Sequence, residues 1–242
     1  MDPRSLEKDA KLELSTRCHY PRRLRSFVRR GRLTALQAQT KDVLWLHYGL
    51  QVAQGLLNFE QVFHRQAPCF LEIGFGLGQS LFALAHQHPD KNFIGIETHP
   101  PGIAKLMTSM AEARLTNLKL YEADAVDVLD QCIALNSLAG IQLFFPDPWP
   151  KRRHHERRLI QCEFVKKMIS KLQSNGHLHL ATDWEDYAVQ MMQVLSLEKD
   201  LHNDAGPGQF GNRSPFRPVI TKFERRALEA VRTIRELQFV KN

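Results

Sequence analysis

The chain has 242 residues, of which 43% are hydrophobic and 24% charged, and its formal net charge is +7. This length allows one domain with a full core. The four cysteines are scattered without Cys-x-x-Cys spacing, which favours reduced thiols over a disulfide framework or a zinc site. No apolar run reaches the length of a membrane span and no signal peptide opens the sequence. We therefore expect a soluble cytoplasmic protein with no membrane partner and no metal.

The excess positive charge lies in one short segment, residues 17–32. It holds seven arginines and no acid, whereas residues 1–16 sum to −1 and residues 33–242 to +1. Such an Arg-rich, core-poor segment is expected to be disordered alone and to become ordered on a polyanion. A transit peptide is the alternative, although acids at positions 2, 7, 9 and 13 argue against it. The prediction is a basic arm over residues 1–33 that binds nucleic acid, followed by a single domain over residues 34–242.

From residue 68 onward, short apolar runs alternate with helical periodicity. Strands are predicted at residues 68–73, 92–97, 118–121, 141–145 and 177–182, with a last strand at the sheet edge over 237–240. Helices are predicted at 78–88, 101–115, 125–135, 156–172 and 184–195, and a long irregular loop at 203–220. This alternation indicates an α/β fold with a doubly wound, mostly parallel sheet and helices on both faces.

The first predicted strand leads into a loop with three glycines. Gly74, Gly76 and Gly78 follow Glu72, and glycines let the backbone pass close to a ligand and turn sharply into a helix. A dinucleotide-binding loop would place its third glycine at position 79, where this chain has Gln79. A purely structural turn is the alternative.

Acidic residues stand at the ends of four successive strands: Glu72, Glu97, Asp124 and Asp147. In doubly wound sheets, ligands bind beyond these strand ends. Glu97 could accept both hydroxyls of a ribose, and Asp124 could accept from an adenine amino group. Asp124 could instead cap the helix that follows it. As a set, the four acids predict a ligand cradle.

The most informative segment is the Phe-Phe-Pro-Asp-Pro-Trp run at residues 144–149. It places Asp147 near Trp149 and between two prolines, so that the carboxylate can accept hydrogen bonds from a base edge and the indole can stack. Five of the next eight residues after Pro150 are lysine or arginine, which can hold phosphates. A surface loop that leads into a solvated helix is the alternative.

These segments together resemble the bacterial tRNA (guanine-N7)-methyltransferase family over most of the chain. The run at 144–149 and the Thr-Lys-Phe-Glu run at 221–224 are the most specific. Residues 25–34, 72–78, 95–97, 124–125 and 181–184 also match. The resemblance implies a seven-stranded Rossmann-like methyltransferase fold with an antiparallel strand near the C-terminus. It also implies S-adenosylmethionine as cofactor, with S-adenosylhomocysteine as product, and tRNA methylated at N7 of a variable-loop guanosine.

The resemblance also implies roles for individual residues. Cofactor contacts are implied for Glu72, Gly74, Gly76, Gly78, Glu97, Asp124 and Asp147, with catalysis by Asp147. Substrate contacts are implied for Lys151, Asp183, Thr221, Lys222, Phe223 and Glu224. RNA contacts are expected for Arg25, Arg29, Arg30, Trp149, Arg153, His154, His155, Glu156, Arg157 and Arg158. Asp183 could instead cap the following helix. A monomer and a homodimer both fit the sequence.

The chain departs from the family after Glu224, where relatives usually have a glycine-containing stretch and this chain has Arg-Arg-Ala-Leu-Glu; Ile220 also looks like an extra residue. Three other functions stay open. A methyltransferase for exocyclic amines would use a comparable Asp/Asn-Pro-Pro loop, but here Pro146 precedes the acid. A nicotinamide-dependent oxidoreductase would want glycine at position 79. A non-catalytic RNA-binding scaffold would have little need for four strand-end acids.

Overall fold

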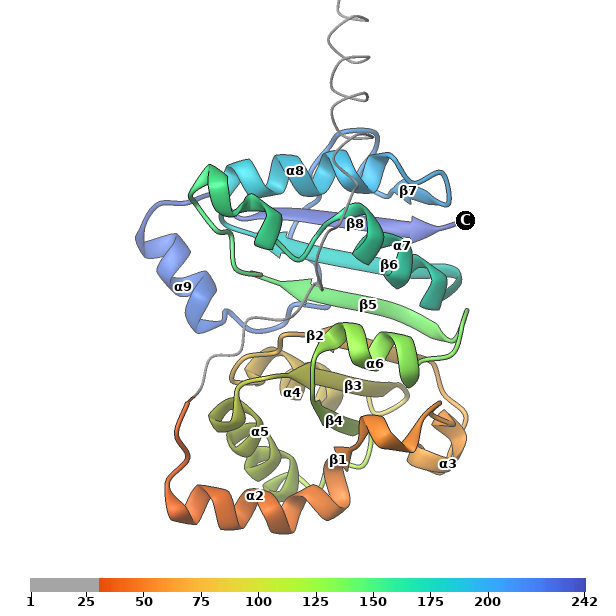
Figure 1. Ribbon diagram of the computed structural model, residues 1–242, viewed down its shortest axis with the longest axis vertical. Helices are drawn as coiled ribbons and strands as arrows, with labels where there is room; N and C mark the ends of the chain where they lie inside the picture. Colours follow the sequence, from red (N-terminus) through yellow and green to blue (C-terminus); the bar gives the residue numbers. More distant parts are fainter. Residues whose placement is uncertain (1–30) are drawn as a thin grey trace, which may run out of the picture.

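One eight-stranded sheet forms the centre of the molecule, in the order β1-β4-β3-β2-β5-β6-β8-β7 (Figure 1). The computed structural model describes residues 31–242, except for the side chain of Phe223. The strands are β1 (Gly49–Leu50), β2 (Cys69–Ile73), β3 (Asn92–Glu97), β4 (Leu118–Glu122), β5 (Leu138–Phe144), β6 (Leu172–Thr182), β7 (Leu201–Asn203) and β8 (Arg235–Lys241). Neighbours pair in parallel, except that β8 runs antiparallel to β6 and β7. The predicted doubly wound, mostly parallel α/β class is confirmed.

Helices cover both faces of the sheet, as predicted. They are α2 (Ala35–Tyr48), α3 (Phe59–Phe63), α4 (Gln79–Gln87), α5 (Pro100–Glu112), α6 (Ala125–Gln131), α7 (Cys162–Lys171), α8 (Glu185–Ser196) and α9 (Lys222–Glu229), with short 3-10 helices η1 (Val52–Gln54) and η2 (Arg152–Arg157). Successive side chains of a strand point to opposite faces, so each strand serves two cores. Phe70 and Phe93 pack with α4 and α5. Leu71 and Ile94 pack with α6, α7 and α8.

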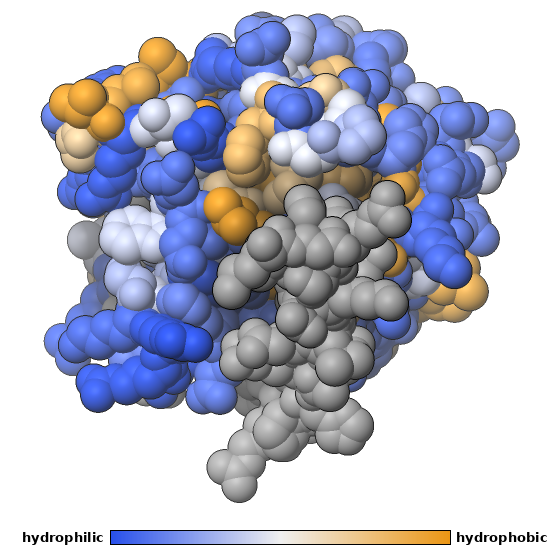
Figure 2. Space-filling model, turned by 90° about the horizontal axis from the view of Figure 1, so that it is seen from above, coloured by the Kyte–Doolittle hydropathy of each residue, from blue (hydrophilic) through white to orange (hydrophobic). Residues whose placement is uncertain are grey.

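The face of the molecule seen from above is largely hydrophilic, with hydrophobic residues at places on its rim and in a central area (Figure 2). None of the helices within residues 31–242 combines the length and the apolar character needed to cross a bilayer.

The strand order reverses between β2 and β5. β2 pairs with β3 on one side and with β5 on the other, and Ile73 of β2 stands in register with Leu143 of β5. The loops that follow these two strands therefore leave the sheet side by side. Ligands of doubly wound sheets bind at this kind of switch point. The loops are residues 74–78 and 145–151, the two that the sequence analysis singled out.

Several predicted boundaries were wrong. β8 is antiparallel as expected but is not the sheet edge, because β7 pairs along its outer side. The helix predicted at 156–172 begins only at Cys162, because residues 152–157 form the separate helix η2. The sheet has eight strands, whereas the resemblance implied seven and the sequence pattern placed six; β1 and β7 were not predicted. With two and three residues, these strands are too short to show a periodic pattern.

An irregular segment, residues 204–220, stands where the long loop at 203–220 was predicted, and it packs against the sheet. Phe216 in this segment stacks on Phe70 and on His88, each with ring centroids 5.5 Å apart. The polar side chains of His179 on β6 and Glu236 on β8 are buried. The segment then leads into α9, which lies beyond the carboxyl ends of β5 and β6 (Figure 1).

Candidate active site

The glycine loop after β2 is held in a conformation that needs its three glycines. Gly74, Gly76 and Gly78 have φ values of 74°, 60° and 73°, which are unfavourable for residues with a Cβ. The carboxylate of Glu97, at the end of β3, accepts a hydrogen bond from Gly76 N at 2.7 Å. A Cβ on Gly74 would meet no atom within 4 Å, so the loop leaves open space beside that residue. This geometry suits a backbone that a ligand approaches closely.

The loop also depends on a glycine in α5, the helix that follows β3. A Cβ on Gly102 of α5 would lie 1.9 Å from the carbonyl oxygen of Gly76. Helix propensity alone would make Gly102→Ala stabilising by about 1 kcal/mol. We expect the opposite: a lower free energy of unfolding and at least tenfold weaker cofactor binding, measured by denaturation and calorimetry. A stabilised variant with unchanged binding would show that the packing of α5 does not control the loop.

Glu72 is the most unusual acid of the site. Its side chain is only 4% exposed, and one of its oxygens, Oε2, is buried without a hydrogen-bond partner in residues 31–242. The pKa of Glu72 is raised to about 8, by burial first and then by the nearby carboxylate of Glu97, while the guanidinium of Arg217 acts to lower it. A buried acceptor without a donor costs free energy. Such a cost is typical of a site that a ligand completes.

The other two strand-end acids already have backbone partners. Besides Gly76, Glu97 accepts from the backbone N–H groups of Thr98 and His99, at 2.7 and 3.2 Å. Asp124 caps α6 by accepting from Val126 N at 2.8 Å, so the capping alternative for this residue is correct. Both side chains are half-buried. A carboxylate has two oxygens with several lone pairs, so its capacity as an acceptor exceeds these bonds.

The loop that follows β5 is held in a strained backbone conformation. Phe145 and Trp149 have φ values of 51° and 44°, a region that bulky side chains rarely adopt. Phe145 N donates to Ala181 O at 2.8 Å, which ties the start of the loop to β6. Asp147, in the middle of the loop, is exposed. Backbone strain of this kind is found at functional sites, where the surrounding structure maintains it.

Helix η2 gathers several of the predicted RNA-contacting residues around Trp149. The ring of His154 meets the indole edge-on, with centroids 5.9 Å apart, and the guanidinium of Arg157 lies 5.1 Å from the indole centroid. Arg153 and Arg157 are exposed, as is Lys151 at the start of the turn. The pKa of His154 is lowered, by desolvation first and then by the neighbouring cations. An aromatic ring beside several cations is suited to a polyanion that carries bases.

Arg158 differs from its neighbours. It is only 1% exposed and its guanidinium bonds Pro148 O at 2.8 Å, Gln190 Oε1 at 2.5 Å and Asp186 Oδ2 at 2.5 Å. It also lies over the ring of Tyr187, 4.8 Å from the centroid. This side chain anchors the loop to α8 from inside, so the expected contact with RNA does not suit its position.

Arg157 and Arg158 form a matched pair for an experiment. Arg157→Ala removes an exposed cation, and we expect weaker tRNA binding with an unchanged melting temperature. Arg158→Ala removes a buried cation with four partners, and we expect a loss of roughly 3 kcal/mol in the free energy of unfolding. Thermal denaturation and tRNA titration separate the two effects. Equal loss of stability in both variants would contradict the assignment of Arg158 as the anchor.

The predicted substrate residues are divided between surface and interior. Thr221 caps α9 by accepting from Glu224 N at 3.2 Å, and Lys222 is exposed. Glu224 is buried and faces Arg213 and Arg217 rather than solvent. The carboxylate of Glu224 therefore faces the interior, and this position does not suit the substrate contact that the resemblance implied.

Asp183 is not the helix cap that the sequence allowed. It receives a hydrogen bond from Arg232 at 2.9 Å, and Thr182 Oγ1 instead accepts from Trp184 N at 3.2 Å. The ion pairs of Arg217 and Arg232 were not predicted from the sequence. Neither arginine stands in a motif, and the acids that they contact are distant in the chain. The predicted contacts of Arg25, Arg29 and Arg30 lie outside the described residues.

The residues at the switch point fit S-adenosylmethionine. The buried Oε2 of Glu72 needs a donor, which the ammonium group of an amino acid can supply. The open space beside Gly74 allows a ligand to approach the backbone, and Glu97 has the position from which such folds hold ribose hydroxyls. Within the described part of the chain, no three His, Cys, Asp or Glu side chains are arranged to hold a metal ion.

Comparison with known proteins first defines the class. The model of a family described as putative methyltransferase matches residues 66–237. The solved structure of the 16S rRNA methyltransferase KamB is 14% identical, with a TM-score of 0.54, and the match covers 90% of this chain and 99% of that one. At this identity the likeness shows the fold alone. The molecule is a Rossmann-like methyltransferase.

Closer relatives define the family. A tRNA (guanine-N(7)-)-methyltransferase of Alcanivorax borkumensis is 50% identical over 221 residues, which cover 91% of this chain and 92% of the relative. The protein of the same name from Hydrogenovibrio crunogenus is 48% identical over 208 residues, 86% of each chain. The chain belongs to the tRNA (guanine-N(7)-)-methyltransferase family.

Proposed function

We propose that this protein transfers a methyl group from S-adenosylmethionine to N7 of a variable-loop guanosine in tRNA. One observation carries the proposal: the loop with Asp147 and the buried, incompletely bonded Glu72 meet at the switch point of a methyltransferase sheet. The names of the relatives supply the substrate class. The tRNA positions and the oligomeric state remain predictions.

Several residues of this chain would hold the cofactor. Glu72 would accept from the ammonium group, Glu97 from the ribose hydroxyls and Asp124 from the adenine amino group, while the backbone at Gly74 and Gly76 would lie close to the ligand. When bound, S-adenosylmethionine supplies an electrophilic methyl group that the lone pair of N7 takes as the carbon–sulfur bond breaks.

Asp147 is the proposed catalytic residue. Guanine N7 has a free lone pair at neutral pH, so no base is needed, and positioning can supply most of the acceleration. Methylation places a positive charge on the purine, and the carboxylate of Asp147 can stabilise it. The same carboxylate can accept from N1–H and the exocyclic amine of guanine, a pair of donors that adenine lacks. Trp149 can stack on a base, which contributes about 1–3 kcal/mol in single-strand binders.

The RNA-binding surface is proposed to continue from the loop to both sides. Lys151, Arg153 and Arg157 are exposed on η2 and its approach, and Lys222 is exposed at the start of α9. These cations can hold phosphates around the base that Asp147 reads. The predicted basic arm over residues 1–33 would add further contacts.

The proposal is tested by methyl transfer from labelled S-adenosylmethionine to bulk tRNA that lacks 7-methylguanosine, followed by nucleoside analysis. We expect label in 7-methylguanosine. Label in an exocyclic N-methyl nucleoside would show that an exocyclic amine, and not N7, accepts the methyl group. Tight tRNA binding without any label would support the scaffold alternative.

A further inference from the structure

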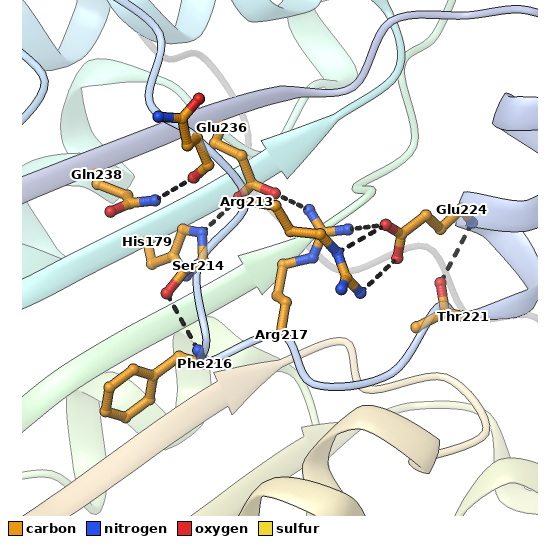
Figure 3. Close-up of polar contacts among 10 residues, drawn as sticks. His179, Arg213, Ser214, Phe216, Arg217, Thr221, Glu224, Glu236 and Gln238 are labelled. Atoms are coloured by element: carbon orange, nitrogen blue, oxygen red, sulfur yellow. Dashed lines mark hydrogen bonds and ion pairs between the residues drawn. The ribbon is translucent and has the colours of Figure 1, made fainter.

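The least expected feature of this molecule is a buried arginine at the centre of a charged network. Arg217 lies in the irregular segment 204–220 and is only 1% exposed. A tight turn fixes its backbone, because Arg217 N donates to Ser214 O at 2.9 Å and Phe216 N donates to Ser214 Oγ at 3.1 Å (Figure 3). The side chain points from this turn toward β8 and the start of α9.

Two buried carboxylates bind the guanidinium from different elements. Glu224 of α9 lies 2.8 Å from Arg217 Nη2, and Glu236 of β8 forms an ion pair with Nη1 (Figure 3). The second oxygen of Glu236 lies 2.5 Å from His179 Nε2 on β6. The half-exposed Arg213 adds a second cation to Glu224 at 3.1 Å. The network thus joins α9 to β8 and, through His179, to β6.

The same guanidinium also contacts the strand that leads into the Asp147 loop. It lies 5.4 Å from the ring centroid of Phe144 and 5.1 Å from that of Phe145. Phe145 has a positive φ and precedes Asp147 by two residues. A cation over both rings restricts how this strained turn can rotate. Arg217 is therefore in contact with the segment that sets the direction of the loop.

Arg217 also acts on Glu72 without a hydrogen bond to it. Among the charged groups that influence Glu72, the carboxylate of Glu97 raises its pKa and the guanidinium of Arg217 lowers it. The cation therefore favours the ionised carboxylate, the form that attracts an ammonium group.

Stability alone does not explain such a network. Buried ion pairs are often no more stabilising than apolar residues of similar volume, because both partners lose their hydration. A conformational role accounts for it better, since the network contacts both the start of the Asp147 loop and α9.

Resting on the function proposed above, we propose that Arg217 is a positioning residue for methyl transfer. It aligns the Asp147 loop with α9 through its contacts with Phe144, Phe145 and Glu224. Its charge also acts on Glu72 of β2, the strand that pairs with β5.

The test compares Arg217→Met and Arg217→Lys with Glu236→Gln, a variant that disturbs the same network but keeps the cation. Three quantities are measured: kcat and KM for tRNA, affinity for S-adenosylhomocysteine, and the pH midpoint of Glu72 in the cofactor-free protein by carboxyl NMR. We expect Arg217→Met to raise the midpoint by about one pH unit and to lower kcat at least tenfold. KM for tRNA should change less than threefold.

The other variants decide between positioning and mere packing. Arg217→Lys should restore the midpoint, because it restores the charge, but not kcat, because lysine cannot hold both carboxylates and both rings. Glu236→Gln should lower the melting temperature and leave the midpoint unchanged. A folded Arg217→Met protein with wild-type midpoint and kcat would overturn the proposal. If Arg217→Met does not fold, wild-type kcat in Arg217→Lys would overturn it.

The NMR and binding results do not require the proposed reaction. If the wild-type protein fails to methylate tRNA, the proposed function fails, but the midpoint of Glu72 still shows whether Arg217 controls its ionisation.

Discussion

Replacing Asp147 by Asn is expected to reduce methyl transfer at least a hundredfold while cofactor affinity stays within a few-fold of wild type. The substitution keeps the shape of the side chain but removes the charge that stabilises the methylated purine, and a single stabilising group of this kind contributes about 10²–10³ in rate. The amide would also present donors to the N1–H and amine of guanine. Single-turnover kinetics and calorimetry with S-adenosylhomocysteine measure the two effects separately.

A matched control is Asp130→Asn on α6, where the carboxylate pairs with Lys167. It should leave turnover unchanged. An Asp147→Asn enzyme that turns over at the wild-type rate would refute the catalytic role.

Glu72→Gln is expected to stabilise the cofactor-free protein and to weaken cofactor binding at least tenfold. The pKa of Glu72 is raised to about 8 in the folded protein, far above the ordinary glutamate value of 4.5. The free energy of unfolding therefore falls as pH rises from about 5 to 8, because Glu72 ionises in the unfolded chain while it keeps its proton in the folded one. Glutamine has no proton to lose and avoids this cost. We expect a gain of about 4 kcal/mol at pH 7.5 that largely disappears below about pH 5.

Denaturant unfolding at pH 5 and pH 8 measures this difference, with Glu163→Gln on the exposed side of α7 as the control. If Glu72→Gln and the control show the same pH slope as the wild-type protein, folding does not raise the pKa of Glu72. A variant that is more stable and binds cofactor more weakly would identify Glu72 as a residue kept for function.

The buried strands and the loops after them could be predicted from the sequence. The five residues of β2 are all buried. The glycines that follow adopt positive φ values, a conformation that glycine reaches more easily than any other residue. Because parallel strand ends meet at one edge of the sheet, the acids after them were expected to lie close together. β2 and β3 pair with Ile73 opposite Ile96, which places the ends of the strands that carry Glu72 and Glu97 side by side.

Helix α9 shows a signal that was present but not used. Thr221 and Glu224 have the spacing of a capping box, which marks a helix start, and Thr221 does accept from Glu224 N. The resemblance instead implied substrate contacts for residues 221–224. Glu224 is turned inward to Arg217, a contact that only the folded chain creates.

The burial of Arg158 and Arg217 could not be predicted in this way. A run of cations usually indicates a solvated surface. The buried guanidinium of Arg158 donates to Asp186 and Gln190, which are 28 and 32 residues away in the sequence. The buried guanidinium of Arg217 donates to Glu236, which is 19 residues away. Long-range partners of this kind have no periodic pattern in the sequence.

The central claim is that N7 of a guanosine in tRNA accepts the methyl group at the Asp147 loop. The most direct test compares a tRNA transcript containing guanosine with one in which 7-deazaguanosine replaces it, so that a carbon stands where N7 would be. We predict that the ordinary transcript is methylated and that the substituted transcript binds but accepts no label. Methyl transfer to the 7-deazaguanosine transcript would contradict the assignment of N7 as the target.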